Sequence, residues 1–102
     1  MYKVLAHELA ARELAELPDR LRGQMFRLIE RLETEGQLKM PHSRVIGGGL
    51  FELRVSGANI ARTLYCYAKG NQIYLLHAFV KKTEKTPAAA IKLARQRLED
   101  FV

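Results

Sequence analysis

The sequence predicts a small α+β domain, and three observations lead to this fold class. Helix-like and strand-like segments alternate in the order β-α-α-β-β-β-α. The short, turn-like connections Ser56–Asn59 and Lys69–Gln72 join three consecutive strand segments, which predicts an antiparallel three-stranded meander. A chain of 102 residues has room for one hydrophobic core, so we expect residues 1–102 to form a single domain.

The N-terminal part is expected to form a strand followed by two helices. Met1–Leu5 reads as a short strand, and leucines at near-helical spacing among alanines predict a helix over Glu8–Leu17. Pro18 ends this helix, Asp19 can cap the next one, and Gly36 stops that second helix at about residue 35. Because the joint is so tight, the two helices should form an αα-hairpin.

The remaining strands and the last helix follow a segment expected to be a loop, residues 36–49, which is rich in glycine. The predicted strands are Leu50–Val55, Ile60–Ala68 and Ile73–Val80. Thr86 is expected to cap the last helix, with Pro87 at its start. The buried stripe of this helix should consist of Ile91, Ala94, Leu98 and Phe101. With helices on one face of the sheet, the other face can form a shallow basic surface.

Positive charge is concentrated in the second half of the chain. Residues 1–49 hold eight Lys and Arg against seven Asp and Glu, whereas residues 50–97 hold nine against two. This asymmetry favours binding to a polyanion such as nucleic acid, or to an acidic protein. The alternative is a basic surface that only keeps the protein soluble.

Several classes of function are disfavoured by what the sequence lacks. The three histidines are scattered, Cys66 is a lone and inert core thiol, and the basic half has only Glu52 and Glu84 as acids, so we expect no metal site and no cofactor. The glycines at 47–49 are not followed by the residues of a phosphate-binding loop. No segment has the length of a membrane span and no signal peptide is visible, so we expect a cytoplasmic protein without membrane contact.

The pattern that remains is a metal-free cationic site suited to RNA. RNA carries its own nucleophile, the 2′-hydroxyl, so cleavage needs a base, cations that stabilise the phosphorane, and a proton donor for the leaving oxygen. The candidate catalytic residues are Arg54, Arg62, His77, Lys81 and Lys82. The candidate substrate-binding residues are Lys85, Lys92 and Arg95.

Strand alternation makes Arg62 the strongest single candidate. It shares a strand face with Leu64 and Cys66, and an arginine among apolar neighbours is costly unless it reaches an anion or solvent. The alternative is that Arg62 pairs with Glu52. Arg54 faces opposite to its apolar neighbours on the preceding strand.

The other candidates also have structural alternatives. His77 is expected to share a face with Ile73, Leu75 and Phe79, with Lys81 next in phase, and it can instead be a hydrogen-bonded core residue. Lys81 and Lys82 can be solubilising charges at a strand end. Unless other evidence assigns them a role, the cations of the last helix are expected to lie on its solvent-exposed face; they are Lys92, Arg95 and Arg97.

Four segments of the C-terminal half carry a family resemblance: GLFELRV, ARTLYCY, IYLLHAFVKKTEKTP and IKLARQRLEDF. Together they resemble the phage-derived, HigB-like branch of the RelE/ParE toxin superfamily. The resemblance implies a compact RelE-like α+β domain and the toxin of a type II toxin–antitoxin system. It also implies metal-free, ribosome-dependent endoribonuclease activity on mRNA, and neutralisation by a helix-turn-helix antitoxin.

By position, Arg62 is similar to the family's phosphate-stabilising arginine, and Lys81 and Lys82 lie where the superfamily often has a catalytic cation. Arg54 falls in a strand where some members carry basic residues. Two alternatives stay open: a ParE-like toxin that inhibits DNA gyrase, and an inactive relative that only binds an antitoxin. Which of His77, Lys81 and Lys82 acts as general base also stays open.

Overall fold

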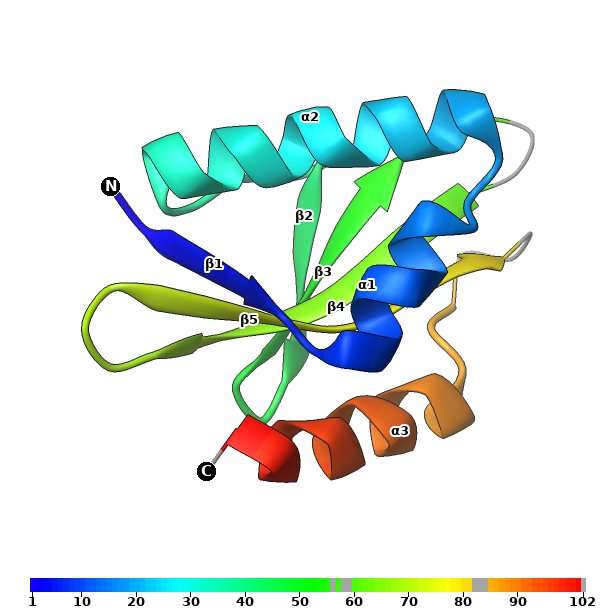
Figure 1. Ribbon diagram of the computed structural model, residues 1–102. Helices are drawn as coiled ribbons and strands as arrows, with labels where there is room; N and C mark the ends of the chain where they lie inside the picture. The colour runs from blue at the N-terminus through cyan, green and yellow to red at the C-terminus, as the bar shows by residue number, and fades with distance from the viewer. Residues whose placement is uncertain (56, 58–59, 82–84, 102) are drawn as a thin grey trace.

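One mixed sheet of five strands forms the centre of the computed structural model, which describes residues 1–55, 57, 60–81 and 85–101 (Figure 1). The strands are β1 (Lys3–Ala6), β2 (Ser43–Gly47), β3 (Leu50–Val55), β4 (Ile60–Ala68) and β5 (Gln72–Lys81). Their order is β1-β5-β4-β3-β2, with β1 parallel to β5 and the other neighbours antiparallel. The predicted meander is therefore confirmed as β3, β4 and β5, and the first strand joins at an edge. Of the predicted turn Ser56–Asn59, all but Gly57 lies outside the described residues.

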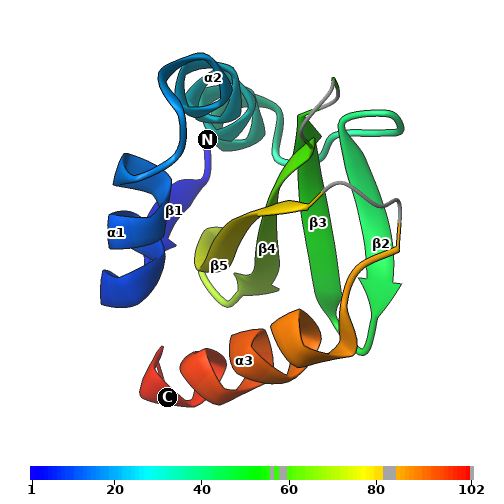
Figure 2. The same ribbon diagram turned by 90° about the vertical axis from the view of Figure 1, so that its right-hand side faces the viewer.

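Helices cover both faces of the sheet, as Figure 2 shows. The helices are α1 (Glu8–Ala15), α2 (Asp19–Glu35) and α3 (Ala88–Leu98), followed by the 3₁₀ turn η1 (Glu99–Phe101). One core lies between α1, α2 and the sheet and includes Met25 and Leu53, and a second core under α3 includes Leu64 and Ala94. The α+β class is confirmed, but α3 covers the face that was expected to be an open basic surface, because its own apolar stripe needs a partner.

The helix ends differ from the expected caps. Gly36 ends α2 with a left-handed φ of 78°, and its N–H bonds to the Leu32 carbonyl at 2.8 Å, as predicted. At the start of α2, however, Pro18 occupies the capping position, so the prediction of an Asp19 cap is wrong. Likewise, Pro87 caps α3 without a side-chain hydrogen bond, so the prediction of a Thr86 cap is wrong.

The expected loop over residues 36–49 contains a strand, so that prediction is wrong for β2. Strand β2 pairs with β3 at the sheet edge, with a bulge between Val45 and Gly47. Gly47, Gly48 and Gly49 all have positive φ angles, which allow the tight reversal into β3. The sequence of β2 gives little indication of a strand, because its apolar segment is short and Val45 points to solvent, 67% exposed.

A bulge in β5 changes which of its side chains share a face. Leu64 pairs with His77, but the next residue, Tyr65, pairs with Leu75, so Leu76 is an extra residue on β5. Leu75 lies in the core under α1 and α2, while Leu76 lies in the core under α3. The alternation of β5 is therefore reset in the middle of the strand. Within the described part of the chain, no helix is long and apolar enough to cross a membrane.

Candidate functional site

Three arginines and one threonine surround the carboxylate of Glu52 at one end of the sheet. Glu52 Oε1 lies 3.3 Å from Arg44 Nη2 and 3.5 Å from Arg54 Nε. Glu52 Oε2 lies 3.7 Å from Arg62 Nη1 and accepts a 2.5 Å hydrogen bond from the Thr86 hydroxyl. The Thr86 oxygen in turn accepts from Arg44 at 3.0 Å and from Arg62 at 3.4 Å. We call these five residues the Glu52 cluster.

The strand register explains how the Glu52 cluster forms. Arg54 of β3 lies directly opposite Arg62 of β4, and like charges in that arrangement repel. Glu52, two residues before Arg54, lies on the same face of β3 and supplies the compensating negative charge. Burial weakens solvent screening, so this ion pairing is stronger than on an exposed surface.

Exposure divides the arginines of the cluster into two groups. The side chain of Arg62 is 0% exposed, whereas that of Arg54 is 11% exposed and that of Arg44 is 33% exposed. Arg62 therefore pairs with Glu52, which was the alternative that the sequence offered for it. Arg54 and Arg44 are the members that a ligand can contact from solvent. Arg44 was missed from the sequence because it lies in the segment expected to be a loop.

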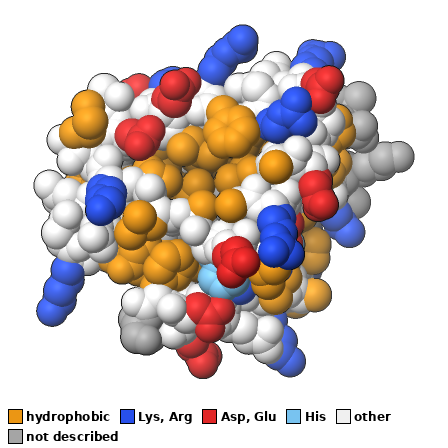
Figure 3. Space-filling view, in the orientation of Figure 1, with side chains coloured by type: hydrophobic (Ala, Val, Ile, Leu, Met, Phe, Trp, Pro, Cys, Tyr) orange, Lys and Arg blue, Asp and Glu red, His pale blue; other side chains and the backbone are white. Residues whose placement is uncertain are grey.

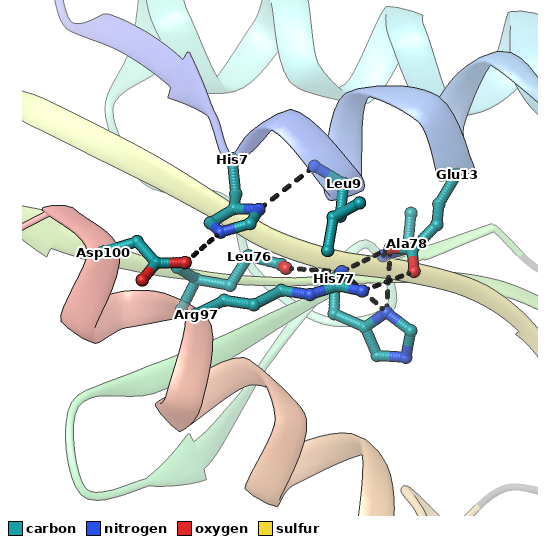
Figure 4. A network of polar contacts seen from close by, with 8 residues as sticks. All are labelled: His7, Leu9, Glu13, Leu76, His77, Ala78, Arg97 and Asp100. Carbon is teal, nitrogen blue, oxygen red and sulfur yellow. Dashed lines mark hydrogen bonds and ion pairs between the residues drawn. The ribbon is translucent and has the colours of Figure 1, made fainter.

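A second polar cluster joins α1, β5 and α3 (Figure 4). Arg97 of α3 donates two hydrogen bonds to Glu13 of α1, from Nη1 to Oε1 at 2.7 Å and from Nη2 to Oε2 at 2.9 Å. His77 of β5 lies with Nδ1 2.9 Å from Glu13 Oε1. Arg97 Nη1 also donates to the Leu76 carbonyl at 3.1 Å. We call Glu13, His77 and Arg97 the Glu13 cluster.

Glu13 also completes the hydrogen bonding of the β5 edge. The last pair between β1 and β5 is Ala6 with Leu75, so β1 leaves the following part of β5 uncovered. There the Ala78 N–H donates to Glu13 Oε1 at 3.1 Å. A side chain of α1 therefore takes the place of a neighbouring strand, which fixes α1 to β5 at this point.

The protonation of the Glu13 cluster follows from these contacts. Burial raises the pKa of Glu13, but hydrogen bonds from Arg97, His77 and the Ala78 amide outweigh it, so the pKa lies below its ordinary value. An ionised carboxylate only accepts hydrogen bonds, so Nδ1 of His77 carries the proton that faces it. When the ring is neutral, its lone pair is therefore on Nε2, which points away from Glu13 and Arg97 (Figure 4).

His77 shares a face with different residues than expected. The bulge at Leu76 puts His77 out of phase with Ile73 and Leu75, so that part of the prediction is wrong. Its ring stacks on Phe79, with ring centroids 4.8 Å apart. The prediction that His77 and Phe79 share a face is therefore correct.

The register brings four of the predicted catalytic residues to one face of the sheet. Arg62 lies opposite Phe79, so His77 and Lys81, two residues to either side on β5, are its diagonal neighbours at about 7–8 Å. Arg54 flanks Arg62 on β3. Lys82, the remaining candidate, lies outside the described residues.

The predicted substrate-binding residues lie around α3. Lys85 and Lys92 are exposed. Arg95 is exposed too, but it donates to the carbonyls of Gly47 and Gly48 at 3.3 Å each, so it ties α3 to the turn between β2 and β3. Among the described residues there is no group of three side chains that could hold a metal ion. Cys66 is buried, and this burial raises the pKa of its thiol, which agrees with an inert core residue.

Two surface hollows are relevant to binding, and one of them borders the Glu52 cluster at Arg54. An apolar groove of about 280 Å³ runs between α1, α2 and β1, and hydrophobic side chains gather there in Figure 3. Phe26, which is 44% exposed, and Val4 line it. A basic cleft of about 300 Å³ lies between α2 and the end of β3, lined by Arg27, Arg31 and Arg54 among others.

Comparisons with known proteins identify the fold and the family of this chain. The Escherichia coli toxin RelE, in a mutant form in the free state, matches with a TM-score of 0.70 at 14% identity, over 95% of this chain and 97% of RelE. The toxin–antitoxin complex RelBE2 from Mycobacterium tuberculosis contains a chain that matches with a TM-score of 0.60 at 20% identity, over 78% of this chain and 98% of that one. No curated protein matches the chain. Residues 12–99 match the sequence profile of the phage-derived Gp49-like protein family. The chain therefore belongs to the phage-derived Gp49-like family and has the RelE fold.

Proposed function

We propose that this protein is the toxin of a toxin–antitoxin pair and that it cleaves mRNA on the ribosome without a metal ion. The family and the RelE fold support a toxin. The observation that carries the nuclease proposal is the shared face of Arg54, Arg62, His77 and Lys81. A group for proton transfer and several cations lie there on neighbouring strands, fixed by backbone pairing.

The cationic residues have proposed roles in the reaction. The 2′-oxygen attacks the adjacent phosphorus, and negative charge develops on the phosphorane oxygens. Arg54 contacts these oxygens from the partly exposed side of the Glu52 cluster, and the buried Arg62 holds Glu52 and Arg54 in place. Lys81 and Lys82 supply further positive charge, and Lys85, Lys92 and Arg95 bind the flanking RNA.

The proposed partner is a small antitoxin of the helix-turn-helix class. The RelBE2 structure is a toxin–antitoxin complex, which supports a partner of that kind for this fold. The apolar groove with Phe26 is a suitable contact surface, since exposed hydrophobic patches on small proteins are often interaction sites. We also propose that the protein acts in the cytoplasm, where ribosomes are found.

The deciding experiment is expression of the protein alone in a bacterial host, with mapping of transcript 5′ ends. We expect growth arrest and cuts phased with codons inside translated regions, and we expect Arg54→Ala to lose both. Arg12→Ala is the matched control, because Arg12 is an exposed arginine of α1 with one weak contact to Glu8 at 3.4 Å. Growth arrest with intact transcripts and accumulating DNA breaks would instead indicate a gyrase inhibitor. Unimpaired growth with folded protein would indicate an inactive relative.

A further inference from the structure

We infer that His77 is the general base of the proposed cleavage and that Glu13, locked by Arg97, is the positioning residue that prepares it. This inference rests on the proposed nuclease function, and it selects one of the three candidate bases. It also gives a role to Glu13 and Arg97, two residues that no motif argument assigned to the site.

The first step of the argument is the orientation of the imidazole. Nδ1 of His77 is held by the Glu13 carboxylate at 2.9 Å, and the bidentate contact with Arg97 prevents that carboxylate from turning away. The Ala78 amide fixes the same carboxylate oxygen from the backbone. A histidine held in this way keeps its proton on Nδ1 and presents a basic Nε2.

The second step is access to Nε2. The side chain of His77 is 13% exposed, and Nε2 is not among the buried, unpartnered polar atoms of the described residues. No hydrogen bond of Nε2 occurs within that part of the chain, and the atom points away from the Glu13 cluster (Figure 4). It is therefore free to accept a proton from a ligand.

The third step is the electrostatic surroundings of the ring. The charged groups that face it are Glu13 from α1 and Arg97 from α3, and these two neutralise each other. Its direct neighbours on the sheet, Leu64 across β4 and Phe79 along β5, carry no charge. Arg62, its diagonal neighbour on β4, is paired with Glu52, and Lys81 lies further along the same face of β5. A neutral imidazole offers a nitrogen lone pair that can accept a proton, whereas the ammonium group of a lysine has three donors and no acceptor.

The reaction balances with His77 in this role. Nε2 takes the proton of the 2′-hydroxyl, and the 2′-oxygen forms a bond to phosphorus. The bond between phosphorus and the 5′-oxygen breaks, and the leaving oxygen takes a proton from water. A 2′,3′-cyclic phosphate and a 5′-hydroxyl are the products, and His77 returns its proton to solvent.

The test measures single-turnover cleavage of mRNA on programmed ribosomes as a function of pH, for the wild type, His77→Gln and Glu13→Gln. We expect His77→Gln to lower the rate roughly 10²-fold or more and to remove the fall in rate on the acid side. His42→Gln is the matched control, since His42 is an exposed histidine outside the shared face. An unchanged rate in His77→Gln would overturn the assignment.

Glu13→Gln tests positioning separately from folding. Because His77, Ala78 and Arg97 Nη1 all contact Oε1, a glutamine that keeps its oxygen there turns its amide nitrogen towards Arg97 Nη2, and the bidentate contact and the negative charge are lost. We therefore expect the ring proton to be held on Nδ1 less firmly, seen as ¹⁵N shifts of the two ring nitrogens that move towards each other, and the rate to fall roughly 10- to 100-fold. If Glu13 has only a structural role, Glu13→Gln will leave the ring tautomer and the fall in rate at low pH unchanged. That result would overturn the positioning role.

Failure of the two proposals can be told apart. If wild-type protein leaves ribosome-bound mRNA intact, the nuclease proposal fails and His77 has no reaction to serve. The ¹⁵N measurement then still decides whether Glu13 sets the tautomer. If the wild type cleaves and His77→Gln cleaves equally well, the nuclease stands and the base lies elsewhere.

Discussion

Arg54 and Arg62 lie directly opposite each other in the ladder between β3 and β4, although both carry a positive charge. Glu52 relieves their repulsion, since its Oε1 lies 3.5 Å from Arg54 and its Oε2 lies 3.7 Å from Arg62. Because Glu52 and Arg62 are both 0% exposed, neither can exchange its partner for water. The cationic face of the sheet therefore depends on one buried carboxylate that is not itself expected to touch RNA.

The first prediction concerns that carboxylate. Glu52→Gln keeps the shape but removes the negative charge shared by three arginines, so we expect the free energy of unfolding to fall by about 3–5 kcal/mol. Urea denaturation followed by circular dichroism measures it. Glu30→Gln is the control, since Glu30 is exposed on α2. Equal midpoints for the two variants would show that the ion pairs around Glu52 contribute little.

The second prediction separates the roles of the two facing arginines. Arg54→Ala should lower mRNA cleavage roughly 10²- to 10³-fold with a modest loss of stability, because Arg54 is partly exposed and is the proposed contact to the developing charge. Arg62→Ala should lower both activity and stability, since it removes a buried partner of Glu52. Thermal unfolding and a ribosome cleavage assay on the same preparations measure the two effects. A stable but inactive Arg62→Ala protein would mean that Arg62 contacts substrate directly.

The third prediction compares two glycines of α2. Gly23 lies inside the helix and a Cβ there would meet no atom within 4 Å, so Gly23→Ala should stabilise the protein by about 0.5–1 kcal/mol. Gly36 ends the helix at φ 78°, and a Cβ there would collide with the Tyr2 ring. Gly36→Ala should therefore destabilise it by more than about 1 kcal/mol. Melting temperatures that shift in the same direction would contradict the helix boundary described here.

Much of the fold was predictable because local signals and tertiary packing agree. The stripe of α2 and the alternation of β3 and β4 each follow one period over many residues, and glycine stops α2 where its conformation is needed. Strand β2 was not predictable in the same way, because its pairing with β3 compensates for a short and partly exposed apolar segment. Edge strands of this kind are stabilised by their neighbour more than by their own sequence.

The candidate site was predictable in part for the same reason. The sequence placed Arg54 and Arg62 on adjacent strands and named Glu52 as a possible partner of Arg62, and the register of β3 and β4 then puts the two arginines on one face. No residue pattern in this apolar strand indicates the bulge at Leu76. His77 was therefore predicted, incorrectly, to share a face with Ile73 and Leu75. Glu13 and Arg97 are 84 residues apart, and their contact arises only when α1 and α3 both pack against β5.

The last prediction concerns the pH dependence of stability through Glu13. Its pKa in the folded protein is lower than the ordinary value of 4.5, so the unfolded chain binds a proton more readily than the folded one. The stabilisation is therefore fully present above about pH 4.5 and is lost as the pH falls through the lower, folded-state value. Glu13→Gln removes this titration, so we expect the wild type to exceed it in free energy of unfolding by more at pH 7 than at pH 3. Glu8→Gln serves as the control, because Glu8 is 80% exposed and contacts Arg12 only weakly. A difference between wild type and Glu13→Gln that stays constant with pH would show that the hydrogen bonds of Glu13 do not favour its ionised form.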